Sequence, residues 1–107
     1  MGQLPLTEPV LLVLLSLAGQ PRHGYSIIKD VEQVSGGRVV LSTGTLYGAL
    51  QRLLTQGWIE DFEEDENSRD RRAYRLTAKG RKNLQVEIDR LKQLTKVASL
   101  RIARKEA

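Results

Sequence analysis

The amino-acid sequence predicts a mainly α-helical protein with a small β-hairpin. Apolar residues recur every three or four positions in several segments, which is the period of an amphipathic helix. Between residues 58 and 77, two short segments containing aromatic residues flank a polar stretch, as the strands of a hairpin do. Residues 84–102 keep an apolar repeat of four and three residues, which predicts one long helix with a coiled-coil seam.

Length and composition bound the class of protein. The 107 residues suit one domain with an appended helix, and the core is small enough that pairing with a second copy would add stability. The net charge of +4 weakly favours an anionic partner. The absence of cysteine excludes disulfides and thiolate chemistry and fits a cytoplasmic location. The longest apolar run, residues 10–15, is far shorter than the roughly 18 residues of a membrane span.

The first predicted helix begins after Thr7, which suits the N-cap, with Pro9 tolerated in the first turn. Residues 10–18 are apolar nearly all round, so this helix must be covered on more than one side. One side could face a partner subunit through Leu11 and Leu15. Alternatively, neighbouring helices of the same chain cover both sides.

A second helix is predicted from His23 to about Val34, ended by the two glycines at 36–37. Residues 38–41 are β-rich and predict a short strand before the next helix. His23 is the single histidine, and without partner histidines or cysteines it is a poor metal ligand. We expect it to serve a turn or cap.

Residues 41–57 predict a helix with two different faces, which begins at Ser42 or Thr43 and ends at Gly57. One stripe is formed by Leu46, Leu50, Leu53 and Leu54. The other side offers groups that can hydrogen-bond to DNA bases and phosphates, although an ordinary amphipathic core helix has the same pattern. The candidate DNA contacts on this helix are Ser42, Thr43, Thr45, Tyr47, Gln51 and Arg52.

Each candidate on that helix has a chemical reason. Free backbone N–H groups at the helix start can meet a phosphate, and Tyr47 can offer its hydroxyl to another. Gln51 suits a bidentate contact with adenine, and Arg52 suits guanine or phosphate.

The hairpin is predicted from strands at 58–63 and 72–77, joined by a polar loop. Its arginines Arg69, Arg71 and Arg72 could reach a phosphate or a narrow minor groove, or could be solvated surface charges. Residues 60–66 include six acids, which would repel DNA. These acids could point away, pair with the arginines across the hairpin, or lower the affinity for DNA.

Thr77 is predicted to start the final helix, whose 27 residues to Arg104 would span roughly 40 Å. That length exceeds the small domain, so part of its apolar seam should project and need a partner, unless the helix folds back. The candidate dimerisation residues are Leu11, Leu15, Leu84, Ile88, Leu91, Leu94, Thr95, Ala98 and Ile102.

The order of elements is that of a winged helix-turn-helix, in which the third helix enters the major groove and the hairpin flanks it. We therefore expect a DNA-binding domain at residues 1–77 and a dimerisation helix at residues 78–107. Homodimerisation would present two such helices to successive turns of double-stranded DNA.

Several segments also resemble one protein family. They are His23-Gly24-Tyr25, residues 41–47, residues 49–53 with Gly57, and residues 72–80. These segments resemble the PadR family of bacterial transcriptional regulators, in particular its compact subfamily with a single C-terminal helix. The resemblance implies a dimeric winged-helix repressor whose first and last helices form the dimer contact. The chain departs from the family at Thr43 and Gly48, where the family often has proline.

The expected function is sequence-specific regulation of transcription, as a repressor on a pseudo-palindromic operator. Release by a small hydrophobic effector between the dimer helices is left open. The alternative is a winged-helix module that binds another protein without specific DNA binding. An enzyme is not expected, because the sequence shows no phosphate loop, metal cluster or thiol, and no cofactor is predicted.

Overall fold

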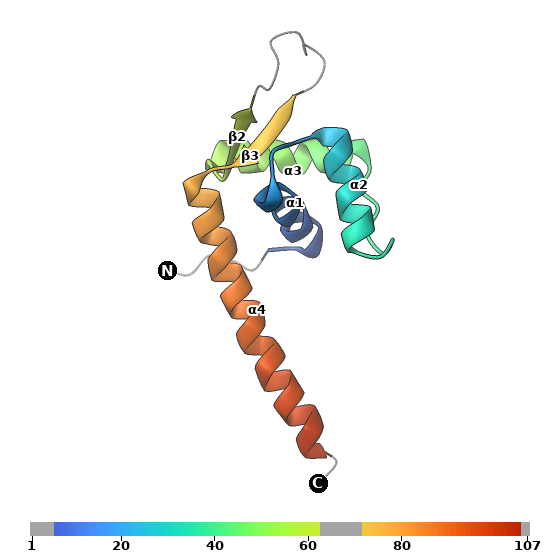
Figure 1. The fold of residues 1–107 in the computed structure, drawn as a ribbon, viewed down its shortest axis with the longest axis vertical. Coiled ribbons are helices and arrows are strands. Elements are labelled where there is room, and N and C mark those ends of the chain that lie inside the picture. The colour runs from blue at the N-terminus through green and yellow to red at the C-terminus, as the bar shows by residue number, and fades with distance from the viewer. Residues whose placement is uncertain (1–5, 63–71, 106–107) are drawn as a thin grey trace.

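The computed structural model describes residues 6–62 and 72–105 of the chain. The described elements, in order, are α1 (Glu8–Gly19), β1 (Arg22–His23), α2 (Gly24–Val34), α3 (Thr43–Gln56), β2 (Ile59–Phe62), β3 (Ala73–Leu76) and α4 (Ala78–Lys105). Figure 1 shows α1, α2 and α3 gathered beside the sheet, while α4 runs away from them. The predicted class, mainly α with a small β-hairpin, is confirmed.

The helix ends follow the predicted capping chemistry. The Oγ1 of Thr7 accepts the N–H of Val10 at 3.4 Å, and the Oγ of Ser42 accepts the N–H of Thr45 at 3.1 Å. Ser42, rather than Thr43, is therefore the N-cap of α3. Gly57 ends α3 with a φ of 78°, a left-handed conformation that glycine adopts without steric cost.

The predicted strand at residues 38–41 is wrong. The third strand of the sheet is instead β1, which pairs antiparallel with β3, so that the strand order is β1-β3-β2. The Oγ of Ser35 accepts the N–H of Val39 at 2.9 Å, so a side chain satisfies part of this backbone. Local β propensity was not sufficient here, because a strand also needs a free sheet edge and β1 occupies the one that β3 offers.

The hairpin itself is confirmed, with strands slightly shorter than predicted. Ile59 pairs with Leu76 and Phe62 pairs with Ala73, in antiparallel register. This register places Glu60 directly opposite Arg75.

The core lies around α1. Residues 12–14 together with Ser16 and Leu17 are buried, while Leu11 is half-buried and Leu15 is 37 % exposed. The helix packs against α2, β3 and α4 of the same chain. Of the two explanations for its all-round apolarity, cover by the same chain therefore accounts for most of α1.

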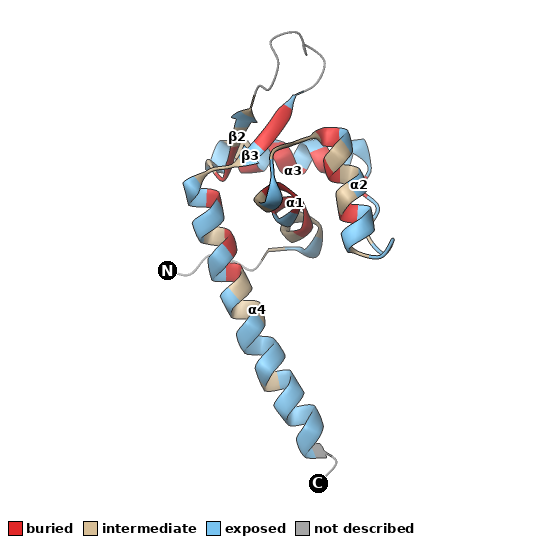
Figure 2. Ribbon diagram, in the orientation of Figure 1, coloured by how far each residue is buried: buried red, intermediate tan, exposed pale blue. Residues whose placement is uncertain are grey.

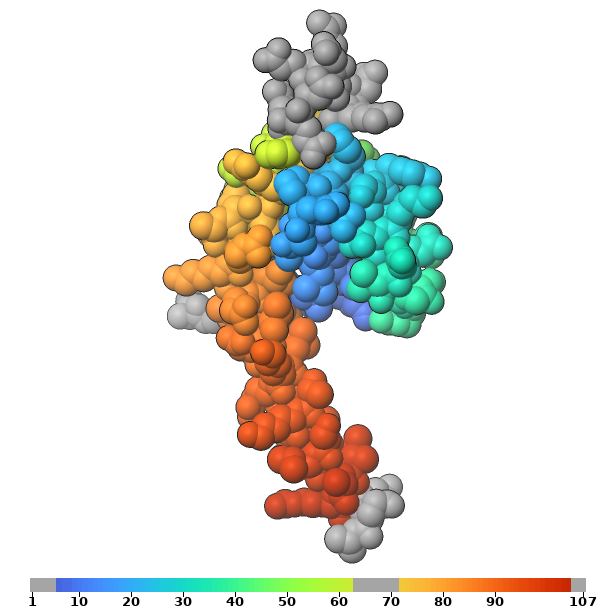
Figure 3. Space-filling model, in the orientation of Figure 1, coloured from blue at the N-terminus to red at the C-terminus, as the bar shows by residue number. Residues whose placement is uncertain are grey.

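The final helix is divided into a packed half and a projecting half. Leu84 is only 3 % exposed and belongs to the core, and Ile88 and Leu91 are partly buried. Farther along, Leu94 is 52 % and Ile102 is 72 % exposed. The projecting half is exposed almost throughout in Figure 2, and in Figure 3 its side chains extend clear of α1 and α2. Part of the apolar seam thus projects, as predicted.

Two sets of contacts attach α4 to the domain. At its start, the Oγ1 of Thr77 donates to the carbonyl of Gly57 at 2.6 Å, and Lys79 donates to the carbonyl of Gln56 at 3.0 Å. These bonds fasten the beginning of α4 to the end of α3.

One turn beyond Leu84, the buried carboxylate of Glu87 accepts the N–H of Leu6 at 3.3 Å and pairs with Arg90 at 2.7 Å. The hydrogen bond from Arg90 lowers the pKa of Glu87 below its ordinary value, against the effect of burial. The charged carboxylate thus holds the beginning of the described chain on α4.

Candidate nucleic-acid interface

The outward face of α3 carries a stripe that lies opposite its buried residues. Leu46, Ala49, Leu50 and Leu53 are buried. At helical spacing, the opposite stripe consists of Gly44, Gly48, Gln51 and Thr55, all exposed. A Cβ added at Gly44 or Gly48 would meet no atom within 4 Å. The first two turns of this stripe therefore present bare backbone. Gln51 was predicted as a DNA contact and Gly48 was noted as a departure from the family, whereas the bare backbone at Gly44 was not predicted, although its spacing from Gly48 is visible in the sequence.

The start of α3 combines a cap with exposed hydroxyls. Ser42 donates its hydroxyl hydrogen to the Oγ1 of Thr45 at 2.9 Å while capping the helix. Thr43 is exposed beside them. The positive end of the helix thus lies at the surface, with donors available for an anion. The three candidate residues at this end, Ser42, Thr43 and Thr45, thus lie side by side on the surface.

Tyr47 lies on the flank of α3 that faces the start of α2. A Cβ added at Gly24 would lie 2.5 Å from the Tyr47 hydroxyl oxygen and 3.1 Å from its Cζ. The Tyr47 ring therefore passes over Gly24, where a side chain would collide with it. Half of the Tyr47 side chain stays exposed. This contact could not be predicted from the sequence, because nothing local in either motif indicates that the two residues touch.

The other flank of α3 carries Arg52, beside Thr45 and Ala49 at helical spacing. Arg52 is exposed, and no acidic side chain in the described ranges pairs with it. Gln51 lies closer to the centre of the outward stripe. The two predicted base-reading residues therefore lie on different sides of α3. Gln51 lies on the outward stripe, and Arg52 lies on the flank next to the beginning of α1.

The base of the hairpin is held by two ion pairs. Arg75 pairs with Glu60 at 2.7 Å, and Arg72 pairs with Asp61 at 3.3 Å. Pairing of acids with arginines across the hairpin was one of three predicted alternatives, and it holds for these four residues. Arg69, Arg71 and the acids at 63–66 lie outside the described residues. Arg72 is exposed but engaged by an acid of its own chain.

Groups from the hairpin base and from α3 both affect the pKa of Tyr74, a buried residue of β3. Burial raises the pKa of Tyr74 on β3 above its ordinary value, and the positive charge of Arg72 opposes that rise. Tyr47 and Asp61 add smaller increases. The pKa of Tyr74 thus depends on Arg72 and Asp61 of the hairpin and on Tyr47 of α3.

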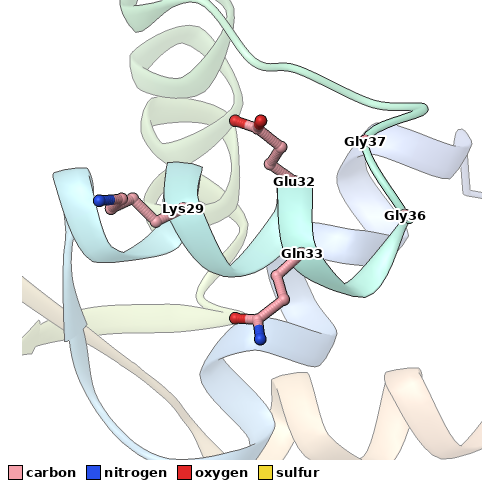
Figure 4. Close-up of a pocket in the computed structure, with 5 residues that line it drawn as sticks. All are labelled: Lys29, Glu32, Gln33, Gly36 and Gly37. Atoms are coloured by element: carbon pink, nitrogen blue, oxygen red, sulfur yellow. The ribbon is translucent and has the colours of Figure 1, made fainter.

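A second surface feature does not resemble a binding site. A shallow depression of about 420 Å³ lies at the end of α2, lined by Lys29, Glu32, Gln33, Gly36 and Gly37. Figure 4 shows that the side chains of Lys29, Glu32 and Gln33 point in different directions, so they do not converge on a ligand. Within residues 6–62 and 72–105, no group of three histidines, cysteines or acids could hold a metal, and no helix could cross a membrane.

Known proteins resemble the chain in both sequence and fold. The model of the transcriptional regulator PadR-like family matches residues 11–86. A PadR family transcription regulator from Clostridium difficile is 26 % identical with a TM-score of 0.73, covering 90 % of this chain and 99 % of that one. A transcriptional regulator from Clostridium thermocellum is 28 % identical with a TM-score of 0.72, covering 84 % and 88 %.

A curated relative is considerably longer. An uncharacterised 37.1 kDa protein in a transposon of Streptomyces fradiae is 41 % identical over 85 residues. The match covers 79 % of this chain but only 23 % of that protein, so the chain spans about a quarter of its length.

Proposed function

Because the chain belongs to the PadR-like family of transcriptional regulators, we propose that it is a repressor that binds a pseudo-palindromic operator as a homodimer. The observation that carries this proposal is the exposed stripe of α3, which lies opposite the buried leucines and follows a capped helix start. A smooth polar face of this kind suits the major groove, where base edges require hydrogen-bonding groups and close approach.

Each contact residue has a proposed role in the complex. Ser42, Thr43 and Thr45 would position the helix start against a phosphate. Tyr47, which is half-exposed, would offer its hydroxyl to the DNA backbone, and Gln51 would read a base from the centre of the stripe. The remaining proposed contacts, to phosphate, guanine or the minor groove, are Arg52, Arg69, Arg71 and Arg72.

The projecting half of α4 supports the homodimer. An apolar seam that extends into water is costly, and a second copy of the same helix would cover it. We propose that the contact begins near Leu91 and continues through Leu94 and Ile102. Leu84 is 3 % exposed, so it has almost no surface left for a partner. The boundary between residues 1–77 and 78–107 therefore separates two proposed roles, DNA binding and dimerisation, while both parts contribute to one core.

The substitution Gln51→Ala tests the role of α3. We expect the variant to lose preference at one base position by about 1–3 kcal/mol without a change in stability, because the side chain is exposed. Anisotropy titrations against a promoter fragment selected by the protein, and against its single-base variants, would measure this. Gln33→Ala, an exposed amide on α2, is the matched control.

The same titrations distinguish the alternative function. Specific binding should weaken steeply as salt rises, since phosphate contacts release counterions. A module that binds only another protein would select no promoter fragment. If Gln51→Ala kept the discrimination of the wild type at every base position, the base-reading role of Gln51 would be contradicted.

The substitution Gly48→Ala should separate stability from DNA binding. Alanine in a helix interior is about 1 kcal/mol more favourable than glycine, and the added methyl group meets no atom of the protein. The protein should therefore melt higher, yet bind DNA more weakly, because the methyl group lies on the face that approaches the groove. Gly19→Ala, in open space at the end of α1, is the control that should gain stability alone. Unchanged or tighter DNA binding by Gly48→Ala would contradict close approach at this face.

The substitution Asp61→Asn should increase DNA affinity. It releases Arg72 from its ion pair and removes one negative charge from the hairpin base. If Arg72 then reaches a phosphate, the slope of log K against log salt should steepen by about 0.9. Asp89→Asn makes the same charge change on α4. Equal gains in both variants would indicate a general charge effect and would contradict specific competition between Asp61 and DNA for Arg72.

A further inference from the structure

A second cavity lies between the beginning of α1 and the first half of α3. Its volume is about 220 Å³, and it is more enclosed than the depression at the end of α2. The walls are aliphatic and include Val10, Val13, Leu41, Leu46 and Ala49. The regulator function proposed above does not use this space.

Among the described residues that line the cavity, Arg52 is the one charged residue. It has no acidic partner in residues 6–62 and 72–105. The hydroxyl-bearing residues Thr7 and Thr45 also line the space, and Thr7 caps the positive end of α1. The nearby acid at that helix start, Glu8, is already paired with Arg38. The electrostatics of the cavity therefore favour a negatively charged group next to an aliphatic body.

We propose that this cavity binds a small aliphatic carboxylate, with its carboxylate on Arg52 and its hydrocarbon chain among Val10, Val13 and Leu46. The volume of 220 Å³ equals that of about seven waters at roughly 30 Å³ each. It is below the roughly 300–1,000 Å³ of sites for drug-sized ligands. A carboxylate of about six carbons fits that space at the density of a liquid. None of the described residues that line the cavity is aromatic, so a flat ring would find no stacking partner among them.

The ligand would also act on DNA binding, and this step rests on the proposed function. Arg52 is a proposed DNA contact, and one guanidinium cannot serve a carboxylate in the cavity and a phosphate or guanine outside it. The acid would therefore lower DNA affinity, and DNA would lower affinity for the acid by the same factor. The cavity would thus be an effector site beside the first half of α3.

The test uses the full chain without DNA, titrated with hexanoate and followed by methyl NMR and calorimetry. We expect a Kd of about 1 mM or tighter, with shifts in the methyl groups of Val10, Val13 and Ala49. Hexanamide has the same body without the charge and should bind at least about tenfold more weakly. Arg52→Gln, at an exposed position that should not affect folding, should cause a similar loss, whereas Lys82→Gln should not.

Equal binding of hexanoate and hexanamide, shifts confined to α4, or no binding at about 20 mM acid would overturn the cavity assignment. If a partner helix or another segment of the chain filled the cavity, the acid would not bind, which is the third of these results. The DNA arm is separate: saturating hexanoate should weaken operator binding by wild type and leave Arg52→Gln unaffected. If the acid binds but operator affinity does not change, the coupling is refuted while the site stands. If no operator binding exists at all, the proposed function fails, and the ligand titration still decides the site.

Discussion

Replacing Gly80 with alanine is expected to destabilise the protein by about 3 kcal/mol. A Cβ at this position would lie 2.8 Å from the carbonyl carbon of Trp58, 3.1 Å from its Cα, and closer still to its carbonyl oxygen. These are backbone atoms of the turn that leads into β2, so they cannot move aside as the end of a flexible side chain can. The whole start of α4 would have to shift away.

Helix propensity predicts the opposite sign for the same substitution. Gly80 lies in the first turn of α4, where alanine would otherwise add up to about 1 kcal/mol of stability. The steric term should win, because the close approach involves two backbones and the bonds of Thr77 hold them together.

Urea unfolding measures the effect, and Gly48→Ala is the matched control, since both replace a helical glycine and Gly48 has open space. We expect the two variants to change stability in opposite directions. If Gly80→Ala were as stable as wild type, α4 could not cross the turn before β2 as closely as the structure shows.

The second large effect is expected from Leu91→Glu, which should convert the proposed homodimer into monomers. Leu91 is partly buried at the point where α4 leaves the domain, and a carboxylate there would lie unpaired in the seam. Operator affinity should fall by about 100-fold or more, because each half-site would lose the high effective concentration that the dimer provides. Analytical ultracentrifugation and anisotropy titration would measure the two consequences.

Two further variants keep this experiment decisive. Ile102→Glu changes a residue that is 72 % exposed in the single chain, so it should break the dimer without disturbing the fold. Gln93→Glu places the same carboxylate on the side of α4 opposite the seam and should leave the dimer intact. If Leu91→Glu and Ile102→Glu both sediment as dimers, the projecting seam is not the dimer contact.

The attachment of α4 to α3 connects these two predictions. Thr77 and Lys79 bind the carbonyls of Gly57 and Gln56, so the end of α3 and the start of α4 are held as one piece. In a dimer formed along α4, the crossing of the two seams would therefore set the separation of the two α3 helices. Binding to successive turns of DNA requires about 34 Å between them.

The parts of the fold that were predicted correctly depend on contacts within a few residues. Capping by Thr7 and Ser42 and the left-handed Gly57 could be read locally, because each cap involves residues at most three or four apart. The leucine spacing of α3 likewise indicated which face would be buried. The strand predicted at 38–41 failed because strand formation depends on a partner, and the partner edge was taken by residues 22–23.

The candidate site shows the same division. Residue types and spacing were enough to predict a polar face on α3 and a final helix whose apolar seam projects in part, and they left pairing of acids with arginines across the hairpin as one of three alternatives. Only the folded chain showed that Tyr47 lies over Gly24, that Asp61 engages Arg72, and that Leu84 belongs to the core. Each of those three facts joins residues from different elements, and their contact depends on how helices and strands pack. Periodicity and capping carry no information about such distances, whereas tertiary packing sets them directly.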